Sequence, residues 1–184
     1  MTISSFINKF LIIFFITSLS ITNAEEWTIK SNENLSFALV SGEITHGDSL
    51  SFFIRKNENC EKIWSTFSVY TYKKPKDINQ LLHKNIPIKL NGKELTASVQ
   101  DVRPFLMGYR VLFSLGHSPV EEYTFFLKEF YDAFQLFEIE IIDDDNFKAS
   151  KYFDIKVNNW KLEKLVPSIR IAYDKCNQLL LPKS

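Results

Sequence analysis

Apolar and polar residues alternate over short runs in the first half of the chain, a pattern typical of β-strands with one face buried. The clearest hairpin is 86–99, where Asn91-Gly92 joins two such runs. Both positions of the favoured two-residue turn need a positive φ, which asparagine and glycine tolerate. The other predicted strands are 37–40, 49–55, 63–72 and 109–114, with a turn expected at 45–48 between the first two.

Two later segments have their apolar residues at the spacing of an α-helix. The first runs over about Val120–Phe134, with Ser118 as the expected N-cap and Pro119 at the first helical position. The second runs over about Pro167–Leu179, and Ile169, Ala172, Tyr173 and Cys176 share the face expected to point into the core. Between the helices, strands are predicted at 136–142 and 152–155.

These elements predict a mainly β fold of the α+β type. We expect an antiparallel β-sandwich or a strongly curved sheet, with one inserted helix and a C-terminal helix that closes the core. No internal repeat or domain boundary is visible, so 25–184 is expected to form a single β-rich domain. The least defined stretch is 160–166, where Pro167 either starts a new helix or kinks one that continues from Asn159.

Residues 1–24 have a different character from the rest. Lys9 is their only charge, an apolar run covers 10–21, and Ala24 precedes Glu25. This is the pattern of a secretory signal peptide, and the run is shorter than the roughly 20 residues that span a bilayer. We expect cleavage after Ala24 and a periplasmic or secreted protein without a transmembrane anchor. An uncut leader that acts as an anchor is the alternative.

Export makes the two cysteines, Cys60 and Cys176, candidates for one structural disulfide. Free thiols remain an alternative. A reactive thiol is less well supported, because the only basic side chains near the cysteines in the sequence are Lys62 and Lys175. A zinc site is also less well supported, because no histidine has the required spacing.

Charge and composition narrow the possible partners. Removing the leader with its Lys9 leaves 21 basic and 22 acidic residues, a net charge of −1. That balance argues against nucleic acid as a partner, which usually selects a basic excess. A hydrophobic content of 45% with 15% aromatic residues excludes a disordered chain.

No group of residues has the spacing of a known reaction centre, so no catalytic residue, cofactor or metal ligand is predicted. His46, His83 and His117 stand near turns or polar segments, and residues 143–146 lack the pattern of a calcium loop. The aromatic segment 125–131 predicts a helix that is either covered on several faces or exposes an apolar patch to a partner. The possible partner-binding residues, each with core packing or solvent exposure as its alternative, are Trp27, Trp64, Trp160, Lys73, Lys74 and Lys76.

The layout resembles that of small exported proteins of proteobacteria, loosely grouped with invasion-associated and type VI secretion-associated accessory factors. The shared features are an early Trp27, Cys60 after the strand 49–55, the strand at Phe153-Asp154 and a final helix ending at Cys176. Asn158-Asn159-Trp160 stands where glycine-rich signatures often precede the last helix. The resemblance implies an exported accessory protein and assigns no catalytic residue.

The sequence therefore leaves two candidate functions. The first is a non-enzymatic interaction module of the cell envelope, with an envelope protein or a polysaccharide as its partner. The second is a small carbohydrate-active hydrolase or carbohydrate-binding protein. A hydrolase would need two carboxyl groups about 5–10 Å apart, for which Glu121-Glu122 or Glu138 with Glu140 are the candidates.

Overall fold

The structure is a computed structural model that describes residues 27–42 and 48–181. The predicted signal peptide 1–24, His46 and all of the predicted turn except Asp48 lie outside the described residues.

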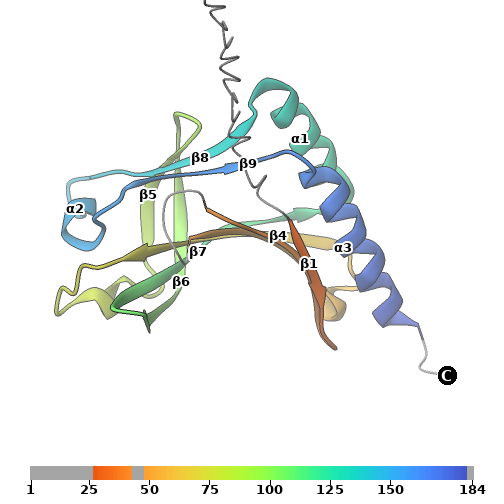
Figure 1. The fold of residues 1–184 in the computed structure, drawn as a ribbon, viewed down its shortest axis with the longest axis horizontal. Helices are drawn as coiled ribbons and strands as arrows, with labels where there is room; N and C mark the ends of the chain where they lie inside the picture. The colour runs from red at the N-terminus through yellow and green to blue at the C-terminus, as the bar shows by residue number, and fades with distance from the viewer. Residues whose placement is uncertain (1–26, 43–47, 182–184) are drawn as a thin grey trace, which may run out of the picture.

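The described chain forms one antiparallel sheet that is curled into a half-barrel (Figure 1), so of the two predicted architectures the curved sheet is present. Its strand order is β1-β2-β3-β4-β7-β6-β5-β8-β9. The curl brings the end of the sheet back over its middle, because Trp160 of β9 contacts Phe67 of β4 with ring centroids 6.2 Å apart. The strands are β1 Thr28–Ser31, β2 Leu35–Ser41, β3 Ser49–Arg55, β4 Lys62–Thr71, β5 Asn85–Leu90, β6 Lys93–Phe105, β7 Gly108–Pro119, β8 Leu136–Ile141 and β9 Val157–Lys161.

The predicted hairpin is confirmed, because β5 ends at Leu90 and β6 begins at Lys93 around Asn91 and Gly92, which both have positive φ.

The helices, including two short 3₁₀ turns, are η1 Lys56–Glu58, η2 Ile78–Leu81, α1 Val120–Ala133, α2 Ala149–Tyr152 and α3 Leu165–Leu180.

The predicted opening of α1 is wrong in detail. Strand β7 continues to Pro119, and Ser118 pairs with Ile63 of β4 instead of capping the helix. No side-chain cap hydrogen bond is present at this end of α1. Strand β7 therefore pairs with β4 up to the residue before the helix. This strand pairing outweighs the local preference of serine for the N-cap position.

The region before the last helix also differs from its prediction. The expected strand at 152–155 is absent, because Tyr152 ends α2 and residues 153–156 form the connection to β9, the strand that pairs with β8. Helix α3 begins at Leu165 after Lys164, whose φ is positive, so Pro167 lies within the first helical turn. Proline is tolerated there because a first-turn N–H has no intrahelical acceptor to lose.

Helix α3 closes the half-barrel by packing on β1, β2 and β3. Ile169, Ala172 and Cys176 are at most 1% exposed, and Tyr173 is half-buried, so the predicted inward face is confirmed at three of its four positions. Cys176 forms the predicted disulfide with Cys60, which ties α3 to the segment that follows β3. Among the described residues, no helix has the length and apolarity needed to cross a membrane.

Candidate functional site

The structure separates the residues that the sequence singled out for partner binding. Trp27 and Trp160 are 8% and 0% exposed, so both rings pack in the hydrophobic core. Trp64 is half-buried on the opposite face of the sheet. Lys73, Lys74 and Lys76 follow β4 in a loop near α2, where Lys73 Nζ donates to the carbonyl oxygen of Ser150.

Trp64 belongs to a row of side chains that crosses the outer face of the sheet. Phe53, Trp64 and His117 are direct neighbours in the strand register. The guanidinium of Arg55 lies 4.6 Å from the Trp64 ring centroid, and Trp64 Nε1 donates to Glu58 Oε2 at 2.7 Å. The row is thus stabilised by its own cation–π contact and hydrogen bond, which is the arrangement of a packed strand surface.

The two carboxylate pairs proposed for a hydrolase lie on different elements, Glu121-Glu122 on α1 and Glu138 with Glu140 on β8. Of these residues, Glu121 lines a groove between α1 and α3, and Glu138 lines a shallow hollow at the start of β8. In the described part of the chain, neither cavity has a second carboxylate or a tryptophan among its lining residues. No group of three or more His, Cys, Asp or Glu side chains in that part could hold a metal ion.

Residues 143–146 form a turn through their own hydrogen bonds. Asp143 Oδ1 accepts from the backbone N–H of Ala149 at 2.9 Å, and Asp144 Oδ1 accepts from that of Asn146 at 2.7 Å. These carboxylates therefore organise the backbone, in agreement with the turn interpretation.

One buried carboxylate was not anticipated from the sequence. Asp48 is 2% exposed, and its Oδ1 accepts from the backbone N–H of Tyr70 at 2.6 Å. Its Oδ2 has no hydrogen-bond partner among the described residues. Burial is the main cause that raises the pKa of Asp48 to about 6, against the lowering effect of the Tyr70 hydrogen bond.

We expect the stability to fall as the pH rises from about 4 to 6. The unfolded chain releases the Asp48 proton near its ordinary pKa of 3.8, whereas the folded protein retains it until about 6. Ionisation across this interval favours unfolding by roughly 2 kcal/mol. Urea unfolding at pH 4, 5 and 6 measures the slope, with Asp48→Asn as the comparison. An equal slope in that variant would assign the effect to other groups.

The outer side of α1 exposes several aromatic side chains. Three aromatic residues of the helix and Phe134 directly after it expose more than a third of their area, and Leu136 at the start of β8 is 37% exposed. We call the four the α1 surface: Phe125 at 65%, Phe126 at 46%, Tyr131 at 38% and Phe134 at 43%. Exposed aromatic residues in such a group are uncommon on monomeric proteins and mark contact sites. Of the two predictions for the aromatic segment, the exposed patch is the one observed.

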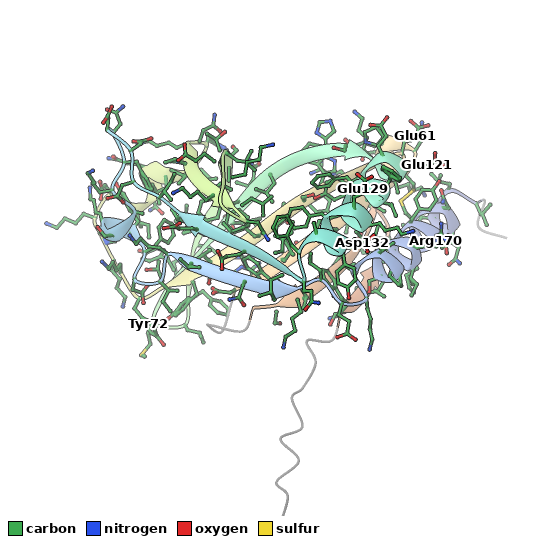
Figure 2. The ribbon with its side chains drawn as sticks, turned by 90° about the horizontal axis from the view of Figure 1, so that it is seen from above. Glu61, Tyr72, Glu121, Glu129, Asp132 and Arg170 are labelled. Atoms are coloured by element: carbon green, nitrogen blue, oxygen red, sulfur yellow. A yellow bond between two sulfur atoms is a disulfide. The ribbon has the colours of Figure 1, made fainter. Side chains whose placement is uncertain are left out.

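Acidic residues accompany the α1 surface. Helix α1 carries Glu121, Glu122, Glu129 and Asp132 against a single Lys128, which gives it a net charge of −3. All five charged side chains are exposed. None of the four carboxylates forms an ion pair with a described residue. Figure 2 shows Glu121, Glu129 and Asp132 at one end of the molecule, with Tyr72 at the other.

A groove of about 700 Å³ separates α1 from α3 beside Phe125. Its apolar lining comes from Val120 and Phe125 of α1 and from Val166 and Tyr173 of α3. Both helices are held in place from below, since Val120 and Leu127 of α1 are buried and α3 is tied down by its disulfide. Phe125 belongs to both the groove and the α1 surface, and the charged residues that line the groove are Glu121, Lys128 and Arg170.

Comparison with known proteins found no match, either to a family model, to a curated protein or to a solved structure.

Proposed function

We propose that this protein is an exported, non-enzymatic interaction module of the cell envelope, which binds a partner protein through the α1 surface. The observation that carries the proposal is the exposure of three aromatic side chains on α1 and of Phe134 directly after it. Aromatic residues supply large contact areas at low entropic cost and dominate the energetics of protein interfaces. The disulfide, the signal-like leader and the layout shared with exported accessory proteins support its place outside the cytoplasm.

The chemistry of the site favours a basic amphipathic helix as the partner segment. Such a helix lays its apolar face into an apolar groove, as in other helix-in-groove complexes. The groove between α1 and α3 provides the apolar floor, and its own charges are mixed, because Lys128 and Arg170 line it beside Glu121. The attraction for lysine and arginine comes from Glu122, Glu129 and Asp132, which lie on α1 outside the groove lining. A polysaccharide is less well supported, because the tryptophans and lysines considered for it are dispersed or buried.

A pair of designed peptides tests this proposal on the mature protein. The probe is an 18-residue amphipathic helix of leucine and lysine, and its counterpart replaces every lysine by glutamate. We expect the leucine–lysine peptide to bind at least tenfold more tightly, measured by fluorescence anisotropy of a labelled peptide. Phe125→Ser should weaken this binding about tenfold, on the scale of one interface anchor, because Phe125 borders both the groove and the α1 surface.

Tyr72→Ser is the matched control, because Tyr72 is 56% exposed and lies at the far end of the molecule (Figure 2). It should leave peptide binding unchanged. Equal loss in both variants, or equal binding of the two peptides, would contradict the proposal. Sedimentation of the free protein identifies the competing occupant: a dimer disrupted by Phe125→Ser would assign the α1 surface to a second copy. The intact mass of protein secreted from a bacterial host tests export, since cleavage after Ala24 leaves a chain that starts at Glu25.

A further inference from the structure

The sheet splits at one end of β6 and β7. The two strands pair from Ser98 with Ser114 down to Phe105 with Gly108. Beyond Ser98 and Ser114 they separate, because residues 93–97 of β6 pair only with β5 and residues 116–119 of β7 pair only with β4. A register shift opposite Ser65 and Thr66 makes Leu115 an extra residue in β7. Bulges of this kind re-aim side chains and are frequent beside binding sites.

The split opens onto a cavity of about 300 Å³, which we call the slot. Helix α1 and strand β8 form its inner end, and the β5–β6 hairpin forms one wall. The apolar side chains that line it are Leu90, Leu95, Leu115, Phe126 and Phe137. The volume corresponds to about ten water molecules in the liquid and lies at the lower limit of small-molecule sites.

Two hydroxyl groups meet inside the slot. Ser65 Oγ and Tyr123 Oη are 2.7 Å apart and share one hydrogen bond. Two hydroxyls carry two O–H donors, so the pair retains one donor for which the described residues show no acceptor. Burial raises the pKa of Tyr123 to about 12, so the phenol keeps its proton at physiological pH. The slot therefore offers a hydrogen-bond donor at the base of an apolar cavity.

The lining also disfavours a charged ligand. The slot has no Asp, Glu, Lys or Arg among its lining residues in the described chain, and its one imidazole, His117, is exposed and packs on the Trp64 ring. A carboxylate or an ammonium group would lose its hydration in the slot without gaining an opposite charge.

We propose that the slot binds a small uncharged molecule with an apolar body and a hydrogen-bond acceptor such as an amide or ester carbonyl. The carbonyl oxygen accepts from the free O–H of the Ser65–Tyr123 pair, and the apolar body fills the space between Leu95 and Phe126. The slot shares no lining residue with the groove between α1 and α3, but Phe126 belongs to both the slot and the α1 surface.

Octanamide is the probe, and octanoate, of equal chain length but negatively charged, is its counterpart. Backbone amide NMR titration of the mature protein should show saturable binding of octanamide, with shifts concentrated at residues 90–96 and 115–126. Octanoate should bind at least tenfold more weakly at pH 7. Tyr123→Phe removes only the hydroxyl and should weaken octanamide binding about fivefold, the effect of one neutral hydrogen bond.

Leu95→Trp should fill the mouth of the slot and abolish binding. Leu82→Trp is its matched control, because Leu82 and Leu95 are 41% and 38% exposed and Leu82 does not line the slot. The proposal is overturned if octanamide does not bind, if octanoate binds equally well, or if Leu82→Trp acts like Leu95→Trp. If Leu95→Trp does not fold, Tyr123→Phe decides, and unchanged affinity there would refute the role of the hydroxyl pair. Loss of peptide binding in Phe125→Ser with octanamide binding intact would separate this site from the proposed function.

Discussion

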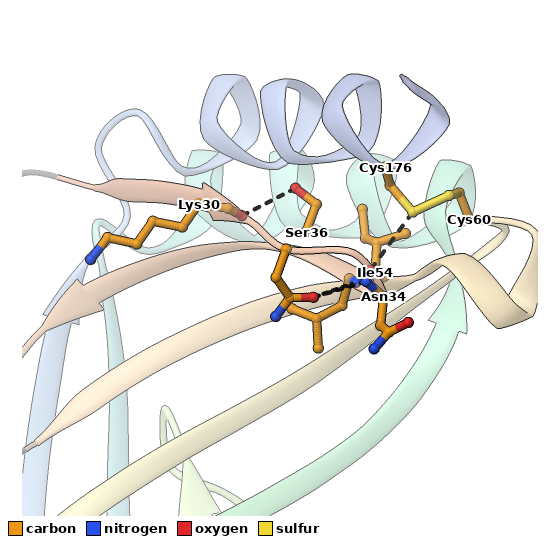
Figure 3. The surroundings of a disulfide bond; sticks show 8 residues. Lys30, Asn34, Ser36, Ile54, Cys60 and Cys176 are labelled. Atoms are coloured by element: carbon orange, nitrogen blue, oxygen red, sulfur yellow. Dashed lines mark hydrogen bonds between the residues drawn. A yellow bond between two sulfur atoms is a disulfide. The ribbon is translucent and has the colours of Figure 1, made fainter. Parts of the chain in front are cut away.

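Replacing Cys176 by serine is expected to lower the free energy of unfolding by about 4–5 kcal/mol. The disulfide joins residues 116 positions apart, so its loss releases a long loop in the unfolded chain. Figure 3 shows where the bond acts, between the inward face of α3 and the segment after β3. Both cysteines are completely buried, so the variant also leaves a polar hydroxyl and a free thiol in the core.

Guanidinium unfolding of the variant and the wild type measures this loss. The control is wild type in the presence of reductant, which should lose a similar amount if the bond accounts for the effect. Thiol labelling of native-purified protein, denatured without reduction, provides the independent check. Two reactive thiols per chain would show that the bond is absent from the protein as it is made.

Trp160→Ala is expected to cost about 3–5 kcal/mol, the range for removing a large aromatic side chain from a core. Trp160 is fully buried in β9 and contacts Phe67 across the curl of the sheet. Its removal empties space between two parts of the sheet that do not pair with each other, where little can move in to refill it.

Trp64→Ala is the matched comparison, because it removes the same side chain from a half-buried position. There the loss is limited to the stacking with Phe53, the ring contact with His117, the cation–π contact with Arg55 and the hydrogen bond to Glu58, together about 1–2 kcal/mol. Chemical unfolding of both variants gives the two values. A larger cost for Trp64 than for Trp160 would contradict the assignment of Trp160 to the core.

The sequence could not distinguish these tryptophans. Burial of a residue in a strand depends on which face of the sheet receives a covering layer. Trp160 lies in β9, whereas the strand in this region was wrongly predicted at 152–155. Its inward orientation therefore could not be inferred from residue alternation. The alternation around Trp64 was visible, but Ile63 and Phe67 had to be seen buried in the core before Trp64 could be placed on the outer face.

The sites show a similar limit. The aromatic composition of 125–131 already indicated that more than one face of the helix is apolar, and it left open whether a second layer covers it. The groove combines α1 with α3, which lie more than thirty positions apart in the sequence. The slot combines five strands and a helix around a split in strand pairing, and no local pattern encodes where two strands separate.

What the sequence determined by itself was local in origin. Residue alternation defined the strands, Asn91-Gly92 defined the hairpin, helical spacing defined α1 and α3, and an isolated pair of cysteines in a chain with an export-like leader predicted the disulfide. Each of these signals depends on neighbours within about ten residues or on simple composition. Tertiary structure alone decided the curl of the sheet, the burial of Trp160 and Asp48, the exposure of the α1 surface and the opening of the slot. These features depend on contacts between segments far apart in the chain, where the free energy of packing outweighs local preference.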